Sequence, residues 1–232
     1  DKGYHVNGTL RDIEKQDRIT RLKSLPSGNN AKFFQADMAE ISSLDHPLIN
    51  SDAAIICCLI PTYKGFDGTP AKELDDERGY NEIIKPTVDG CLNILKSAKI
   101  NNVKNILICS STSSTNPISQ VLIKNELDHW SDEKEQCNSK KYTSAAKTYM
   151  EKAAFKYCNE NNLRLSVFLP TGLYGPAVLP EHLKHNPFLW IKSVLEGGPP
   201  RHQKVPNDSA SLIHIQDLAK LFLAAYENPS AS

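Results

Sequence analysis

Apolar and polar residues follow two periods along the chain, one typical of short buried strands and one typical of helices. Residues 53–60 form a continuous apolar run, AAIICCLI, as expected for a central parallel strand covered on both faces. Shorter strands are predicted at 4–10, 32–36, 105–109 and 163–169. Residues 82–96 and 142–162 instead repeat apolar positions every three to four residues, which predicts amphipathic helices. Strands that alternate with helices in this way indicate an α/β fold with a parallel sheet.

Composition and charge exclude several classes of partner. The 232 residues include 27 basic and 27 acidic side chains, so the zero net charge favours neither nucleic acid nor an anionic membrane as a partner. No apolar run approaches the length of a membrane span. None of the six cysteines shows the spacing of metal ligands, and four lie in apolar runs. We therefore expect reduced thiols, no metal site and a cytoplasmic protein.

A run of hydroxyl side chains follows the predicted strand at 105–109. Residues 110–114 read SSTSS, and serine-rich runs are by default turns. In doubly wound sheets, however, the carboxyl ends of the strands face the ligand crevice. We therefore expect this run to take part in binding. The glycine-rich pattern G-x-G-x-x-G, which cradles a pyrophosphate in such folds, occurs nowhere in the sequence.

Several motifs in the second half of the chain carry a family resemblance. Lys147 precedes the block Glu151–Ala154 (EKAA), and the strand predicted next leads into P-T at 170–171 and G-P at 175–176. Two further strings, IIKPTV at 83–88 and ELDHWSD at 126–132, stand in the same order. This frame resembles the extended short-chain dehydrogenase/reductases, in the branch of dihydroflavonol reductases, cinnamoyl-CoA reductases and related carbonyl reductases.

The resemblance implies a doubly wound parallel-sheet fold of the Rossmann type. It divides the chain into a dinucleotide-binding domain at 1–176, part of a small substrate-binding lobe at 177–210, and a strand and helix at 211–232 that return to the main domain. The family's first strand, glycine-rich turn and first helix have no counterpart here. We therefore expect the fold to lack its first β-α unit and the dinucleotide-binding domain to be incomplete.

The resemblance also implies an activity, the NADPH-dependent reduction of an aldehyde, ketone or thioester carbonyl in a small-molecule substrate. In that chemistry Tyr142 donates a proton to the carbonyl oxygen. Lys147 lowers the pKa of the tyrosine, near 10 when unperturbed, and holds the nicotinamide ribose. Ser111, or Thr112 in an alternative alignment, polarises the carbonyl. The oligomeric state stays open.

The spacing of the tyrosine differs from the family pattern. Tyr142 lies five residues before Lys147, and Thr143 occupies the position four before it. Five residues rotate a helical side chain by roughly 140° from the lysine. Tyr142 and Lys147 can therefore serve one site only if Tyr142 precedes the first regular turn or the helix carries a bulge.

The cofactor preference is predicted from the residue that follows the strand expected at 4–10. Arg11 stands where the family distinguishes its two nicotinamide cofactors, and an arginine suits a 2′-phosphate, so we expect NADP. The other cofactor contacts that the resemblance implies are Asp37 and Met38 beside the adenine, Cys58 and Leu59 next to the nicotinamide ribose, and Pro170 and Thr171 at the nicotinamide through their backbone.

Two rival functions remain on the sequence alone. The first is a non-catalytic cofactor-binding or structural subunit of the same fold, which the displaced tyrosine favours. The second is a different reaction of the same family, that of a sugar-nucleotide epimerase or dehydratase or of a hydroxysteroid dehydrogenase. The IIKPTV and WSD strings favour the carbonyl reductases over the second rival.

Overall fold

The computed structural model describes residues 2–59, 61–119, 121, 123–184, 186–197 and 211–231. The strands are β1 (Val6–Leu10), β2 (Ala31–Gln35), β3 (Ala53–Ile56), β4 (Asn105–Cys109), β5 (Arg164–Phe168), β6 (Gly172–Tyr174) and β7 (Leu212–His214). The α-helices are α1 (Gln16–Lys23), α2 (Ile41–Leu48), α3 (Asp76–Gly79), α4 (Lys85–Ile100), α5 (Glu133–Asn138), α6 (Tyr142–Glu160), α7 (Asn186–Glu196) and α8 (Ile215–Glu227).

Every strand pair in the described chain is parallel, as the alternation of strands and helices predicts. β1 pairs with β2, β6 pairs with β7, and β3, β4 and β5 form a ladder with β4 at its centre. The registers place Ile56 opposite Ile108 and Cys109 opposite Phe168. The carboxyl ends of β3, β4 and β5 therefore meet at one edge of the sheet, where a doubly wound fold binds its ligand. The predicted Rossmann-type architecture is confirmed.

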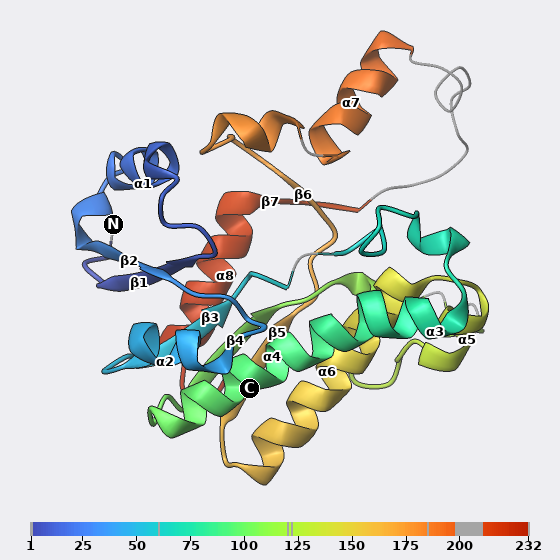
Figure 1. Cartoon of the computed structure of the whole chain (residues 1–232), viewed down its shortest axis with the longest axis horizontal. Coiled ribbons are helices and arrows are strands. Elements are labelled where there is room, and N and C mark those ends of the chain that lie inside the picture. The colour runs from blue at the N-terminus through green and yellow to red at the C-terminus, as the bar shows by residue number, and fades with distance from the viewer. Residues whose placement is uncertain are drawn as a thin grey trace.

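Helices cover both faces of the central ladder (Figure 1). On one face α4 and α6 lie side by side, with α2 packed against α4, and together they enclose the largest apolar cluster. On the other face α8 brings Leu218 and Phe222 onto Leu107 of β4, and Phe222 stacks on Phe168 with 4.1 Å between the ring centroids. Burial on both faces explains why β4 reads as a continuous apolar run. The prediction of a central strand at 53–60 is wrong in this respect, because β3 lies at the edge of the ladder and leaves Ile55 57% exposed.

The helix predicted at 82–96 begins earlier than the apolar pattern indicates. Asp75 caps α3 by accepting a hydrogen bond from the Arg78 backbone N–H at 2.8 Å. A π-helical turn, Tyr80–Ile84, then joins α3 to α4, so helical structure continues from Asp76 to Ile100. A π turn shifts the side chains that follow it around the helix, and such turns often occur near functional sites.

The C-terminal part of the chain leaves the sheet and returns to it. The predicted lobe at 177–210 is described only up to residue 197 and without residue 185, and it contains α7. After residues 198–210, which lie outside the described residues, β7 pairs with β6 and α8 packs against β4. None of the described helices is both long enough and apolar enough to cross a membrane.

Candidate functional site

An open pocket of about 710 Å³ lies at the carboxyl ends of β4 and β5. Its walls include Ser111 and Thr112, which follow β4, and Pro170 and Thr171, which follow β5. A backbone hydrogen bond from the Thr112 N–H to the Pro170 carbonyl, at 3.4 Å, ties the two loops together. The structure thus brings together two groups of residues that the sequence predicts separately, the hydroxyl run and the P-T pair.

Buried polar groups hold the hydroxyl run 110–114 in place. Gln136 on α5 donates to the Ser113 carbonyl at 2.9 Å, and the hydroxyl of Ser131 donates to the same carbonyl at 2.8 Å. From α6, the carboxylate of Glu151 accepts the hydroxyl of Ser110. Because buried partners fix this backbone, the hydroxyls of its pocket-lining residues are positioned before any ligand arrives.

Lys147 is buried below the ends of β3 and β4, with 3% of its surface exposed. Its ammonium group donates a hydrogen bond to the Leu59 carbonyl. Burial lowers the pKa of Lys147, because a charged group loses hydration there, while Glu151 one turn along the helix acts in the opposite direction. Lys147 in turn acts to lower the pKa values of the Cys58 and Cys109 thiols, so it lies close to these strand ends.

Leu59 packs into the core and holds Lys147. Its side chain is 2% exposed and belongs to the main apolar cluster, and its carbonyl is bound to Lys147. A bulky aliphatic side chain at this position gains more from the core than from a polar crevice. Leu59 thus anchors the lysine, and a cofactor contact at this residue stays a prediction.

Tyr142 does not lie beside Lys147, and its predicted role as proton donor is corrected. Helix α6 is α-helical from Tyr142 to Glu160 without a bulge, so Tyr142 belongs to its first turn and the side chains of Tyr142 and Lys147 point to different sides. The Tyr142 hydroxyl donates to the Asp76 carboxylate at 2.6 Å, and the ring is 1% exposed. Burial and the hydrogen bond to Asp76 raise the pKa of Tyr142, whereas a general acid at neutral pH needs a lowered one.

The tyrosine ring instead joins two helices. Ring atoms of Tyr142 lie so close to Gly79 of α3 that a Cβ added at Gly79 would come within 2.5 Å of Cζ. Glycine permits this approach because it has no side chain. The position four before the lysine belongs to Thr143, whose hydroxyl donates to the Thr62 carbonyl. The sequence pattern reveals neither Asp76 nor Gly79 as a partner of Tyr142, because both lie more than sixty residues away along the chain.

The remaining predicted cofactor residues lie at or near strand ends. Asp37 follows β2 and accepts the Ala39 backbone N–H at 2.9 Å, while Met38 packs against Gly90 and offers its carbonyl to Asn93 at 3.0 Å. Cys58 is exposed just beyond β3. With the Met38 side chain and carbonyl committed to helix packing, Asp37 and Cys58 are the better placed of these three to meet a ligand.

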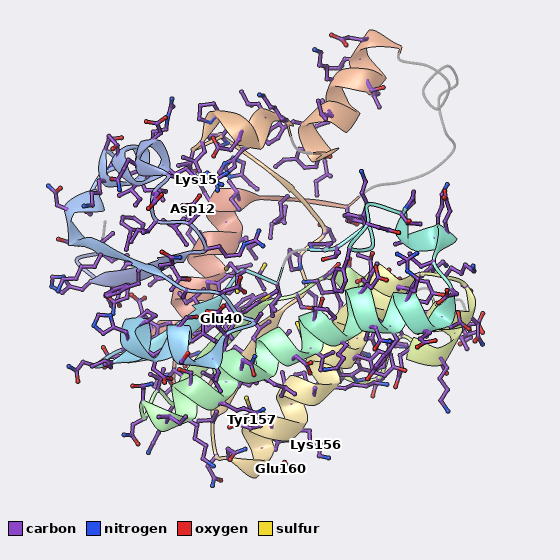
Figure 2. All side chains as sticks on the ribbon, viewed as in Figure 1. Asp12, Lys15, Glu40, Lys156, Tyr157 and Glu160 are labelled. Carbon is purple, nitrogen blue, oxygen red and sulfur yellow. The ribbon has the colours of Figure 1, made fainter. Side chains whose placement is uncertain are left out.

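Arg11 lies exposed at the end of β1, where the sequence predicts it to read a 2′-phosphate. The neighbouring carboxylate of Asp12 pairs with Lys15 at 3.5 Å, and Figure 2 shows these two side chains close together between β1 and α1. Within the described parts of the chain Arg11 has no ion-pair partner. Its guanidinium group therefore stays available to an anionic ligand.

Glu151 is a buried titratable group that the sequence reasoning did not assign to the site. Its position four residues after Lys147, on the same face of the predicted helix, could have indicated that the two side chains lie close together. Burial raises its pKa to about 7, and its hydrogen bonds to Ser110 and Ser114 and the charge of Lys147 oppose this rise. The carboxyl group therefore changes charge near neutral pH, directly below the hydroxyl run.

This pKa predicts how stability changes with pH. Between the ordinary glutamate pKa near 4.5 and about 7, the folded chain binds a proton that the unfolded chain has released, so the free energy of unfolding falls as pH rises through this window. A shift of this size corresponds to about 3 kcal/mol. We expect Glu151→Gln, which resembles the protonated acid, to flatten the dependence, as measured by urea unfolding from pH 5 to 8.

The exposed Glu160 on the same helix supplies the control for this measurement. Glu160→Gln should leave the slope of stability against pH as it is in the parent chain. An equal slope in the parent chain and in Glu151→Gln would contradict the assignment of this titration to Glu151.

Comparison with known proteins places this site in a family. The model of the NAD dependent epimerase/dehydratase family matches residues 3–232. The chain is 30% identical over 237 residues to the dihydroflavonol 4-reductase of Callistephus chinensis, with all of this chain and 61% of that protein covered. Across the curated relatives that it matches, the chain spans 60% to 68% of their length.

Solved structures show the same fold at lower identity. Vestitone reductase from alfalfa (Medicago sativa) superimposes with a TM-score of 0.71 at 21% identity, covering 99% of this chain and 67% of the other. Yeast methylglyoxal/isovaleraldehyde reductase Gre2, solved in complex with NADPH, superimposes with a TM-score of 0.76 at 20% identity, covering 99% and 69%. The resemblance predicted from the sequence is confirmed: the chain belongs to the NAD-dependent epimerase/dehydratase family of extended short-chain dehydrogenase/reductases.

Proposed function

We propose that this chain belongs to an NADPH-dependent reductase that converts an aldehyde, ketone or thioester carbonyl to an alcohol at the pocket beside β4 and β5. The observation that carries the proposal is the convergence of Ser111 and Thr112 with Pro170 and Thr171 in one pocket, at the sheet edge below which Lys147 is buried. Relatives named as dihydroflavonol 4-reductases, and the NADPH complex of the yeast reductase, support this class of reaction.

The residues present fit the dinucleotide at this edge of the sheet. The free guanidinium group of Arg11 suits a 2′-phosphate, which two forked N–H donors can bind. Asp37 and Cys58 follow β2 and β3, and the backbone at Pro170 and Thr171 borders the pocket that would take the nicotinamide. When bound, the cofactor supplies the hydride that reduces the carbonyl carbon.

In this proposal, side chains of the chain itself stabilise and protonate the carbonyl oxygen of the substrate. The hydroxyl of Ser111, or of Thr112, donates to that oxygen and stabilises the negative charge that develops on it. The hydroxyl passes its proton to the oxygen and regains one from solvent, which reaches it through the open pocket. The buried ammonium group of Lys147 adds a fixed positive charge below this edge of the sheet, which stabilises the same negative charge. Tyr142 takes no part, since its hydroxyl is bound to Asp76.

One observation favours a second candidate, a cofactor-binding subunit without catalysis. The tyrosine is committed to the packing of α6 on α3, and a threonine stands at the position four before Lys147. Aliphatic hydroxyls are far weaker acids than a tyrosine whose pKa is lowered. The second candidate predicts NADPH binding without turnover.

One experiment distinguishes the two candidate functions. NADPH binding is followed by its fluorescence, and NADPH consumption is followed against a panel of aldehydes, ketones and acyl thioesters, with the full-length protein. Binding together with turnover of at least one carbonyl supports the reductase. Saturable binding without consumption of NADPH across the panel supports the cofactor-binding subunit, and absence of binding overturns both.

The choice between NADPH and NADH is tested at Arg11. We expect Arg11→Ala to weaken NADPH binding by about 10-fold to 100-fold, because a charge-assisted pair with the 2′-phosphate is lost, and to leave NADH binding nearly unchanged. Lys23→Ala, at the far end of α1, is the matched control for loss of one positive charge. An equal loss of affinity for both cofactors in Arg11→Ala would contradict the assignment.

A further inference from the structure

Two cysteines face each other across neighbouring strands at the edge of the site. Cys109 is the last residue of β4, and Cys57 directly follows β3. The register places Ile56 opposite Ile108, so its continuation places Cys57 opposite Cys109. Side chains opposite each other on paired strands point to the same side of the sheet. Neighbouring strands lie about 4.8 Å apart, within the range of Cα separations that a disulfide bridges.

The two thiols already interact. The Cys57 S–H donates a hydrogen bond to the sulfur of Cys109, which lowers the pKa of Cys109 to about 7 and raises that of Cys57. Burial opposes the change at Cys109, and the Lys147 ammonium group adds to it. The lowered pKa favours the thiolate of Cys109, the form that reacts with oxidants. Cys57 is exposed, so a small oxidant can reach the pair of thiols from solvent.

We propose that Cys57 and Cys109 are a site of reversible oxidation at which a hydroperoxide converts the facing thiols to a disulfide. The Cys109 thiolate attacks one oxygen of the peroxide, so that an S–O bond forms and the O–O bond breaks. The departing hydroxide or alkoxide takes up a proton, and Cys109 becomes a sulfenic acid. The sulfur of Cys57 then attacks Cys109, forming the S–S bond and breaking the S–O bond, and the proton of Cys57 leaves with the hydroxide as water.

Oxidation of this pair affects the loops that follow β3 and β4. Cys109 directly precedes the hydroxyl run 110–114, and Cys57 lies two residues before Leu59, whose carbonyl holds Lys147. A disulfide between them ties the loop that follows β3 to the loop that follows β4. Because the strand spacing already suits the bond, the cross-link forms without separation of the strands.

The test is a cross-link map of the full-length protein. The protein is treated with hydrogen peroxide, alkylated and cleaved after lysine and arginine, which releases residues 33–64 with Cys57 and Cys58, and 105–124 with Cys109 as their only cysteine. We expect these two peptides to appear joined, two hydrogens lighter than their sum, and to separate after treatment with a dithiol. Cys58→Ser should keep the cross-link, whereas Cys57→Ser and Cys109→Ser should each abolish it.

A second readout does not depend on the cross-link. Cys109 should react with iodoacetamide at neutral pH at least ~10-fold faster than Cys91 and Cys158, whose buried thiols have pKa values raised to about 12 and about 11. A cross-link that persists in Cys57→Ser, or that vanishes in Cys58→Ser, would overturn the proposal. So would the absence of any joined peptide in the peroxide-treated parent chain.

Discussion

Replacement of Lys147 by methionine is expected to lower kcat/KM for carbonyl reduction by ~100-fold or more, the usual effect of losing one preorganised group that stabilises a developing oxyanion. Methionine keeps most of the aliphatic length of lysine, so the packing below β3 and β4 is retained. The ammonium group that provides the positive charge and donates to the Leu59 carbonyl is lost. The measurement is the initial rate of NADPH consumption, with NADPH affinity determined in parallel.

Lys152 on the same helix is the matched control for this substitution. It is exposed, pairs with Glu133 and lies over the ring of Trp130 at 5.8 Å from the centroid. Lys152→Met should therefore leave kcat/KM within about 3-fold of the parent, because exposed ion pairs contribute little. Full activity in Lys147→Met, with NADPH still bound, would remove Lys147 from the mechanism.

Gly79→Ala is expected to destabilise the fold by about 1–3 kcal/mol, although alanine suits helices better than glycine. The helical preference alone would stabilise the variant by about 1 kcal/mol. The added Cβ, however, would lie 2.5 Å from Cζ of Tyr142, whose buried ring is tethered to Asp76 and cannot move aside freely. Overpacking of a well-filled core therefore outweighs the preference. Denaturant unfolding measures the difference.

Gly90 provides the contrast for this prediction. A Cβ at Gly90 would meet the Met38 sulfur at 2.8 Å, and that sulfur is near the end of a flexible side chain that can adjust. Gly90→Ala should therefore cost less than Gly79→Ala. In a chain that already carries Tyr142→Ala, the cost of Gly79→Ala should disappear, because the clashing ring is gone. A cost that persists without the ring would show that the clash lies elsewhere.

Much of the fold and part of the site could be predicted from local patterns. The apolar run at 105–109 predicts a buried strand correctly because helices cover both faces of β4, so nearly every residue of β4 is apolar. The hydroxyl run and the P-T pair could be placed in the site because parallel strands bring their carboxyl ends to one edge. That inference needs only the order of strands, which the sequence pattern provides.

The parts that could not be predicted depend on contacts between distant segments. The helical spacing indicates that Tyr142 and Lys147 point apart, but not that Asp76 and Gly79 receive the tyrosine. These partners belong to a helix that the apolar pattern does not reveal, since α3 is short, polar and capped by Asp75. The resemblance implies a cofactor contact at Leu59, but it does not reveal that the side chain of Leu59 is buried in the same apolar cluster as residues of α4 and α6.

The central claim is that Lys147 and the hydroxyls of the pocket act without Tyr142, and Tyr142→Phe tests it most directly. The measurement is kcat/KM for the best carbonyl substrate, with NADPH affinity and unfolding recorded for the same samples. We predict activity within ~5-fold of the parent, because the lost hydroxyl bonds Asp76 and not the substrate. Stability should fall by about 2 kcal/mol, since a hydrogen bond to a charged group is lost. A fall in kcat/KM of ~100-fold or more, with NADPH affinity unchanged, would contradict the claim and return the proton donor to Tyr142.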